Sequence, residues 1–315
     1  MSFPPKPDHS ASNYPMTGPL AESRPELQRL YPAERPLVPL RWYGKMMELL
    51  SPERVECVLC SKSFYLRPHQ PATGPSGLPT AWGKGVCSRC SDSIPWIRRI
   101  QCHVCGRPNY CGDCCRRSGS SFVRSRSAVQ YTLEMRQLLA RYKYRGEERL
   151  LPWLAAMLQP AYAKLSEELL IGDGLFSIKK NAAPAFDLIT SVPVSEQRLL
   201  ERGFNQAERL AASLAVRIGL PARPLLTRQE ERGKMSAKTR KERLETAIGL
   251  FTSAPETPEI LSIIARRSPV QRRSLRLLLV DDIYTTGGTL DSCAFALQMA
   301  APVPIDIYGL TWARA

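Results

Sequence analysis

Four cysteine pairs of the form Cys-X-X-Cys constrain the first half of this chain more than any other feature. Together the pairs contain eight cysteines: Cys57 and Cys60, Cys87 and Cys90, Cys102 and Cys105, Cys111 and Cys114. A pair with this spacing can direct two thiolates at one metal ion, and two pairs complete a tetrahedral zinc site. The sequence therefore predicts two structural zinc ions. Consecutive pairing of the motifs is favoured, and interleaved pairing is the alternative.

A disulfide framework in an exported protein is the other interpretation of these cysteines. The first ten residues, MSFPPKPDHS, lack the apolar centre of a secretory signal, and the chain has no run of about 18 apolar residues. We therefore expect a cytoplasmic protein without membrane insertion, in which reduced thiols bind metal. Cys115 is a possible substitute for Cys114 as a ligand. Cys293 is expected to be a small buried side chain.

The chain divides into three segments by composition. Residues 1–44 are rich in proline and polar residues without a helical or alternating pattern, which predicts a disordered extension. Met46 or Met47 is an alternative start of the native product. Residues 45–120 are expected to form the double zinc ribbon, and residues 121–315 a second domain.

Apolar runs alternate with amphipathic segments throughout this second domain. Strands are predicted at residues 123–131, 187–194, 222–227, 275–280 and 304–313. Helical spacing of apolar residues predicts helices at residues 135–142, 151–158, 204–218 and 288–300. Strands that alternate with helices predict an α/β fold with a parallel sheet flanked by helices. Ligands of such sheets bind beyond the carboxyl ends of the strands.

Two adjacent carboxylates follow one of these strands in the sequence LLLVDDIYTTGGTL. At the rim of the sheet, Asp281 and Asp282 can accept hydrogen bonds from hydroxyl groups. A turn then opens the next helix, where free N–H groups and the helix dipole attract an anion. The turn consists of Thr285, Thr286, Gly287, Gly288 and Thr289. The stretch suits a sugar phosphate, and the alternative is a generic capped helix after a strand.

This stretch resembles the phosphoribosyl pyrophosphate motif of type I phosphoribosyltransferases. By that resemblance Asp281 and Asp282 hold the ribose hydroxyls, and the turn holds the 5-phosphate. Tyr284 departs from the motif, since an aliphatic residue is common there. The donor carries its own leaving group, so the protein would orient it and neutralise its charge with Mg²⁺ and basic residues.

Two further motifs extend the resemblance. KYRG begins at Lys143, and RGFNQAERLA begins at Arg202. With the cysteine pairs, these motifs are similar to the ComF family of bacterial competence proteins, which carry an amino-terminal zinc ribbon. The resemblance covers the chain from Cys57 to its end. In related transferases the loop after the strand at residues 187–194 meets pyrophosphate, which makes Arg198 and Arg202 candidates for that contact.

A basic segment resembles the mobile loop that covers the donor in such enzymes. It contains Lys234, Lys238, Arg240 and Arg243. The segment lacks the Gln and Asn that are common in the family at neighbouring positions, so a solvated basic loop is the alternative.

The ComF resemblance implies a role in natural competence, in which single-stranded DNA is taken up and handled alongside a competence helicase and a recombination mediator. Lys and Arg number 44 against 29 Asp and Glu, and the resulting net charge of +15 favours a polyanionic partner. Lys143 and Arg145 are predicted to contact DNA phosphates. Candidate stacking faces for bases are Trp82, Trp96, Tyr110 and Tyr131.

Three functions stay open at this point. The first is a Mg²⁺-dependent phosphoribosyltransferase, a pentosyl-transferring glycosyltransferase whose acceptor is unidentified. The second is a non-catalytic DNA-binding protein that senses phosphoribosyl pyrophosphate or a nucleotide. The third, nucleobase salvage, is weaker because no base-binding hood is recognisable. The chain's histidines, His9, His69 and His103, all precede the second domain, which disfavours a His-dependent hydrolase.

Overall fold

The computed structural model describes residues 53–66, 74–116, 119–172, 185–229, 249–267 and 274–315. The part of the chain from Pro52 to Ala315 forms one compact unit. The predicted amino-terminal extension and the basic segment around Lys238 lie outside the described residues. The boundary near residue 120 stays a prediction.

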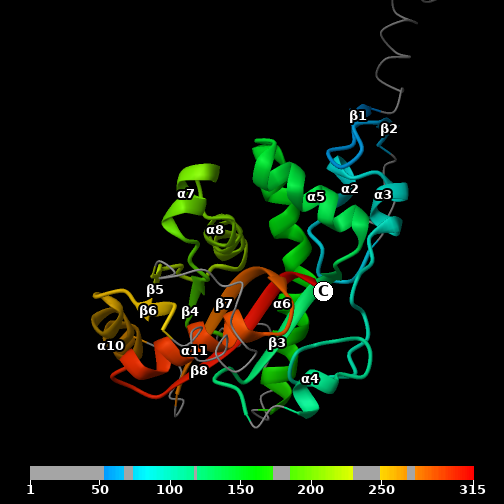
Figure 1. The fold of residues 1–315 in the computed structure, drawn as a ribbon. Helices are drawn as coiled ribbons and strands as arrows, with labels where there is room; N and C mark the ends of the chain where they lie inside the picture. Colours follow the sequence, from blue (N-terminus) through cyan, green and yellow to red (C-terminus); the bar gives the residue numbers. More distant parts are fainter. Residues whose placement is uncertain (1–52, 67–73, 117–118, 173–184, 230–248, 268–273) are drawn as a thin grey trace, which may run out of the picture. The chain divides into compact units, whose positions relative to one another are not determined.

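Four strands of the described chain form a parallel sheet in the order β3-β8-β7-β4. Their bounds are β3 (Arg124–Gln130), β8 (Ile305–Arg314), β7 (Leu275–Tyr284) and β4 (Leu188–Ser191). Figure 1 shows β7 (orange) beside β8 (red), the two strands that occupy the middle of this order. The predicted α/β fold with a parallel sheet is confirmed.

Helices cover both faces of this sheet, which explains the continuous apolar run in β7. On one face Leu278 and Val280 lie in a core with residues of three helices, and on the other face Leu277 and Leu279 pack with Cys293. The three helices are α5 (Leu133–Tyr144), α6 (Leu151–Gly172) and α8 (Gln206–Ile218), and Cys293 belongs to α11 (Gly288–Ala300). None of the described helices is long and apolar enough to cross a bilayer.

Two of the predicted strands differ from the structure. The strand expected at residues 222–227 contributes only a single bridge, from Ala222 to Ile189, to the parallel sheet in the described residues. The last two residues of the predicted strand instead belong to β5 (Leu226–Arg228), which pairs antiparallel with β6 (Phe251–Ser253). The strand expected to end at residue 280 continues to Tyr284, because β8 extends equally far and pairs with it.

Several short elements were not predicted. The remaining elements of this region are η2 (Glu148–Leu150), α7 (Glu196–Arg202) and α10 (Thr257–Arg267). The helix α7 separates β4 from α8, and it ends where Gly203 adopts the left-handed conformation with φ of 76°. The loop after β4 is therefore partly helical, and it carries both arginines that were proposed to meet pyrophosphate.

The cysteine-rich segment has little regular structure, and its first part packs around one tryptophan. Its elements are β1 (Arg54–Glu56), β2 (Ser63–Tyr65), α2 (Trp82–Gly85), α3 (Ser88–Ser93) and α4 (Gly112–Cys115). Trp82 is fully buried, donates a 2.9 Å hydrogen bond to the Ser91 hydroxyl, and meets Trp96 and Trp153 edge to face. Trp153 belongs to α6, so this segment shares a core with the helices of the sheet.

Candidate functional site

The acid pair lies in the part of β7 that extends past its neighbour. β4 ends at Ser191, which pairs with Val280, so Asp281 and Asp282 follow directly after the last β4 pairing. Consecutive residues of a strand point to opposite faces. Asp282 is buried towards α5 and α8, and Asp281 is half-buried. The two carboxylates therefore start from the same strand but meet different neighbours.

Asp282 joins the three sequence motifs. Its Oδ2 forms an ion pair with the Lys143 ammonium of KYRG, and it accepts a 3.2 Å hydrogen bond from Nε2 of Gln206 in RGFNQ. The Lys143 and Asp282 side chains are each only 11% exposed. Lys143 is therefore engaged inside the protein, which corrects its expected role at DNA phosphates. Arg145, two residues later, is exposed.

The charge state of Asp281 depends on this crowding. Burial and the neighbouring Asp282 carboxylate raise the pKa of Asp281 well above its usual range. The backbone amide of Asp282 donates a 2.8 Å hydrogen bond to Oδ1 of Asp281, which partly offsets the rise. A carboxyl with a raised pKa next to a second carboxylate favours a proton, a hydroxyl donor or a cation as its partner.

The turn after β7 presents an uncapped helix start. Gly287 is the N-cap of α11 with φ of 86°, a left-handed conformation that favours glycine, and no side chain caps this end. Around Gly288 an added Cβ would meet only the Thr286 hydroxyl, at 3.8 Å. Thr285, Thr286 and Thr289 are exposed. Backbone N–H groups and hydroxyls here are accessible to an anion.

Only one of the two arginines proposed for pyrophosphate belongs to the network around the acid pair. Arg202 donates a 3.1 Å hydrogen bond to Oε1 of Gln206 and a 2.7 Å hydrogen bond to the Tyr144 hydroxyl. Gln206 in turn contacts Asp282, so Arg202 is linked to the acid pair through one residue. Arg198 lies exposed on α7.

Asn205 ties the end of β4 to the start of α8. Its Nδ2 donates to the Val192 carbonyl over 3.1 Å, and its Oδ1 accepts from the Ala207 amide over 3.0 Å. This N-cap places the next residue, Gln206, against Asp282. Sequence reasoning gave no role to Gln206, although it stands within a quoted motif.

The eight cysteines form two groups of four. Within each group, the four sulfurs all lie within 4.8 Å of one another. The groups follow the order of the chain: Cys57, Cys60, Cys87 and Cys90, then Cys102, Cys105, Cys111 and Cys114. Four sulfurs at about 2.3 Å from a tetrahedral ion stand about 3.8 Å apart. The Sγ atoms of Cys60 and Cys87 are 4.0 Å apart, and those of Cys105 and Cys111 are 3.5 Å apart. Both groups therefore fit one metal ion each.

The thiols of the second group differ in how readily they lose a proton. Burial raises the pKa of Cys111, but hydrogen bonds from the Cys114 amide and from neighbouring thiols outweigh burial and bring the pKa to about 7. Metal ligation requires the thiolate form. Burial raises the pKa of Cys105 and of Cys114, so an ion would have to displace the protons of these two thiols. Cys115 stands exposed outside the group, and Cys293 is fully buried, as expected for a small core residue.

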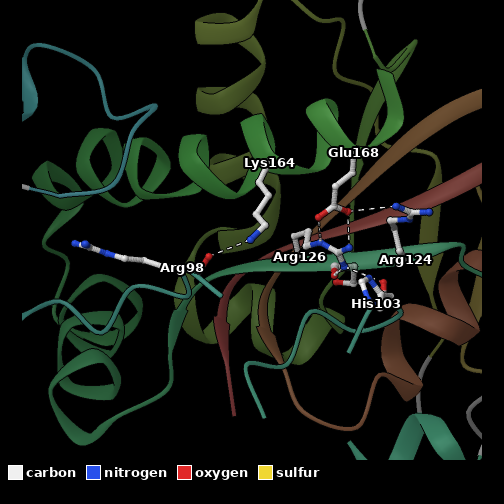
Figure 2. Close-up of polar contacts among 7 residues, drawn as sticks. Arg98, His103, Arg124, Arg126, Lys164 and Glu168 are labelled. Atoms are coloured by element: carbon white, nitrogen blue, oxygen red, sulfur yellow. Dashed lines mark hydrogen bonds and ion pairs between the residues drawn. The ribbon is translucent and has the colours of Figure 1, made fainter. Parts of the chain in front are cut away.

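One arginine anchors each group to the rest of the unit. Figure 2 shows Arg126 of β3 between Glu168 and His103, and its Nη1 donates a 3.0 Å hydrogen bond to the His103 carbonyl within the Cys102–Cys105 loop. Its Nε donates to Glu168 over 3.0 Å. In the first group Arg141 donates a 2.6 Å hydrogen bond to the Leu59 carbonyl. Each group therefore has one of its loops fixed by an arginine of the α/β region.

Most of the predicted aromatic stacking faces are unavailable. Trp82 and Trp96 are buried in the core, and Tyr131 packs against it. Tyr110 is 77% exposed, so it alone among the four candidates presents most of its ring to solvent.

Comparison with known proteins gives relatives along most of the chain. No protein-family model matches. "Competence protein ComFC" of Bacillus subtilis is 28% identical over 251 residues, 76% of this chain and 88% of the relative. The protein of the same name from Streptococcus pneumoniae is 29% identical and covers 71% of this chain and 86% of itself. "DNA utilization protein YhgH" of Salmonella typhi is 26% identical over 72% of this chain and 89% of the relative.

Among solved structures, two adenine phosphoribosyltransferases are similar in part. The protein from Thermoanaerobacter pseudethanolicus has a TM-score of 0.21 and 17% identity and covers 49% of this chain and 80% of its own. The protein from Leishmania tarentolae has a TM-score of 0.23 and 15% identity, with 54% and 74% covered. TM-scores this low do not establish a shared fold, so the fold class of this chain is assigned from its own parallel sheet. Sequence similarity over most of the chain, the parallel α/β sheet and the two groups of four cysteines show that the chain is homologous to the ComFC, ComF and YhgH proteins of the competence family.

Proposed function

We propose that this chain is a ComF-type protein that binds phosphoribosyl pyrophosphate between the acid pair and the turn, and that it handles single-stranded DNA in natural competence. One observation carries the proposal. Three motifs distant in sequence meet at Asp282, which stands shortly before a helix start that no side chain caps. Carboxylates that precede a helix start without a side-chain cap match a ligand that carries hydroxyls at one end and a phosphate at the other.

The chain's own residues divide the ligand between them. Asp281 and Asp282 accept hydrogen bonds from the ribose hydroxyls, and the N–H groups of the turn receive the 5-phosphate. Arg202, which is linked to Asp282 through Gln206, and the exposed Arg198 of α7 are the proposed contacts for pyrophosphate. The Asp281 carboxylate is the side chain that would hold Mg²⁺. When bound, Mg²⁺ supplies charge neutralisation for the leaving pyrophosphate.

In the catalytic version of this proposal the protein positions the donor and does little covalent chemistry itself. The bond from the ribose C1 to pyrophosphate breaks, and a bond from C1 to a nucleophilic atom of the acceptor forms while that atom loses its proton. Lys143 and Gln206 both contact Oδ2 of Asp282, so this carboxylate can still accept a hydroxyl through its remaining lone pairs.

A non-catalytic role is the second candidate, and one observation favours it. Asp282 is already engaged by Lys143 and Gln206, which leaves less capacity for a substrate than two free carboxylates would have. In this version the ligand acts as a signal, and the same site reports it to a DNA-binding surface. Nucleobase salvage receives no support from any described contact.

Each group of four cysteines is proposed to hold one zinc ion. Four thiolates close the coordination sphere, so the role of the ions is folding and not catalysis. The net charge of +15 and the exposed Arg145 and Tyr110 are the features available to single-stranded DNA. A cytoplasmic location, a competence helicase and a recombination mediator as partners stay predictions.

Calorimetric titration of phosphoribosyl pyrophosphate, with and without Mg²⁺, tests the site. We expect binding that strengthens with Mg²⁺ and weakens at least about tenfold in Asp281→Ala, which loses a charge-assisted contact. Asp92→Ala, an exposed aspartate of α3, is the matched control and should bind as the native chain does. Binding that is equal in both variants, or absent in the native chain, contradicts the proposal.

Pyrophosphate release assayed over bases and amines separates the two versions. Release that depends on an acceptor supports the enzyme, whereas donor binding without release by any acceptor supports the sensor. For DNA, we expect affinity for single strands that falls steeply with salt and weakens in Arg145→Ala. An affinity for single-stranded DNA that does not change with salt concentration contradicts this electrostatic explanation.

A further inference from the structure

One buried arginine touches both the second cysteine group and the turn. Arg314, at the end of β8, is 4% exposed. Its Nη1 donates a 2.6 Å hydrogen bond to the Thr285 carbonyl, and its Nη2 donates to Sγ of Cys105 over 3.4 Å. The guanidinium also lies over the Tyr284 ring, 4.1 Å from its centre. A single rigid side chain therefore bridges a candidate metal ligand and the first residue of the turn.

The charge of Arg314 needs a counter-charge, because an unpaired buried cation is strongly unfavourable. Among the described residues, no carboxylate forms an ion pair with it. Its acceptors are two backbone carbonyls and one sulfur. Four thiolates around one divalent ion carry a net negative charge, so the metal-bound second group would supply the missing anion next to Nη2.

The Cys102–Cys105 loop cannot easily shift to follow Arg314. Arg126 holds the His103 carbonyl from the β3 side (Figure 2), and the Ser125 amide donates a 2.6 Å hydrogen bond to the Val104 carbonyl. Arg314 itself is fixed by strand pairing with Tyr284 on one side and Gln130 on the other. Because the cysteine loop and the Arg314 backbone are both held in place, we expect a change in charge at Cys105 to alter the contact between the Arg314 side chain and the Thr285 carbonyl.

We propose that Arg314 is a positioning residue that couples metal binding by the second cysteine group to the conformation of the turn formed by residues 285–289. With metal bound, anionic sulfur holds the guanidinium, and the guanidinium holds the Thr285 carbonyl. Without the ion, the four sulfurs are no longer held as one group beside the guanidinium, so Arg314 loses its fixed position and the turn loosens. Coupling of this kind is reciprocal, so an anion bound at the turn would also strengthen metal binding.

Because the anion at the turn belongs to the proposed function, the test reads the turn without any ligand. Amide hydrogen exchange is measured on the full chain, and zinc content is measured on the same samples. Cys114→Ala removes a ligand of the second group without touching Arg314, and Cys60→Ala does the same in the first group. We expect amides of residues 285–289 to exchange about tenfold faster in Cys114→Ala and unchanged in Cys60→Ala. Unchanged exchange of α8 shows that the unit stays folded.

Arg314→Lys tests the bridge itself. Lysine keeps the positive charge but lacks the planar fork that reaches two acceptors at once. We expect this variant to retain both zinc ions, to show about tenfold faster exchange in the turn, and to show no further increase when a chelator removes zinc. Arg126→Lys contacts the same cysteine loop but not the turn, so its turn should exchange as in the native chain.

If Cys114→Ala does not fold, partial chelation of the native chain gives the same comparison as zinc content falls. The proposal is overturned if the turn exchanges at the native rate after the second group has lost its metal. It is also overturned if Arg314→Lys responds to chelation as the native chain does. Faster exchange on metal loss, together with no binding of phosphoribosyl pyrophosphate, would leave this coupling intact and remove only the proposed function.

Discussion

Replacing Lys143 by Met leaves the Asp282 carboxylate without its ion-pair partner. Both side chains are only 11% exposed, so water cannot take the place of the ammonium. Gln206 still donates one hydrogen bond to Oδ2, but a single neutral donor does not replace the positive charge of the ammonium. We expect Asp282 in this variant to escape the unpaired charge by binding a proton.

Proton binding sets an upper limit on the loss of stability. Keeping a carboxyl with an ordinary pKa of about 3.9 neutral costs about 1.4 kcal/mol per pH unit above that value, or about 4 kcal/mol at pH 7 and about 1.5 kcal/mol at pH 5. Deleting one partner of a buried ion pair costs about 3–5 kcal/mol. The variant should therefore lose about 3–4 kcal/mol at pH 7 and about 1.5 kcal/mol or less at pH 5. The sign follows from linkage, because a raised folded-state pKa makes stability fall as pH rises.

Urea unfolding at pH 7 and pH 5, in the same zinc concentration, measures this loss from the midpoint at constant slope. The double variant Lys143→Met with Asp282→Asn should regain most of the stability at pH 7, because the amide no longer needs a counter-charge. Arg149→Met is the matched control, since its pair with Glu56 is more than half exposed and should cost less than about 1 kcal/mol. An equal loss at both pH values, or single effects that simply add in the double variant, would refute the buried-pair account.

Two further predictions concern the acid pair and the cysteine-rich core. Asp281→Asn should raise the melting temperature at pH 8, by about 2–4 °C per kcal/mol, because the pKa of Asp281 is raised and its ionisation opposes folding. Scanning calorimetry should show this gain shrinking towards pH 4, and a gain that persists there contradicts the reasoning. Trp82→Ala should cost about 3–5 kcal/mol and lower one common transition of the cysteine-rich segment and the sheet, because Trp82 packs on Trp153. Two separate transitions by circular dichroism would show instead that the two parts unfold independently.

Local patterns were sufficient for most of the fold. The apolar runs at residues 187–194, 275–280 and 304–313 became β4, β7 and β8, and the helical spacing at 288–300 became α11. Strand and helix periods are properties of a few neighbouring residues, so they can be read directly from the chain. The segment at residues 222–227 failed this test because a short apolar run does not specify which strand it pairs with.

The candidate site was predictable only in part. Asp281, Asp282 and the turn stand together in one stretch, so their proximity needs no folding argument. Gln206 and Asp282 are 76 positions apart, and the motif that contains Gln206 marked a place in the sequence without indicating its contact. Lys143 was assigned to DNA because a lysine followed by arginine looks like part of a basic surface, whereas the fold buries its ammonium against a carboxylate.

The sequence alone determined most of the strands and helices, the place where a Thr/Gly turn follows two acids, and which thiols stand in Cys-X-X-Cys pairs. All of these depend on spacing over a few residues. Only the tertiary structure decided that Lys143 neutralises Asp282 and that Arg314 joins Cys105, 209 positions away, to the turn. Such contacts arise when strand pairing and helix packing bring distant atoms together and exclude water. A local sequence pattern therefore does not indicate which charged side chains will form a buried pair.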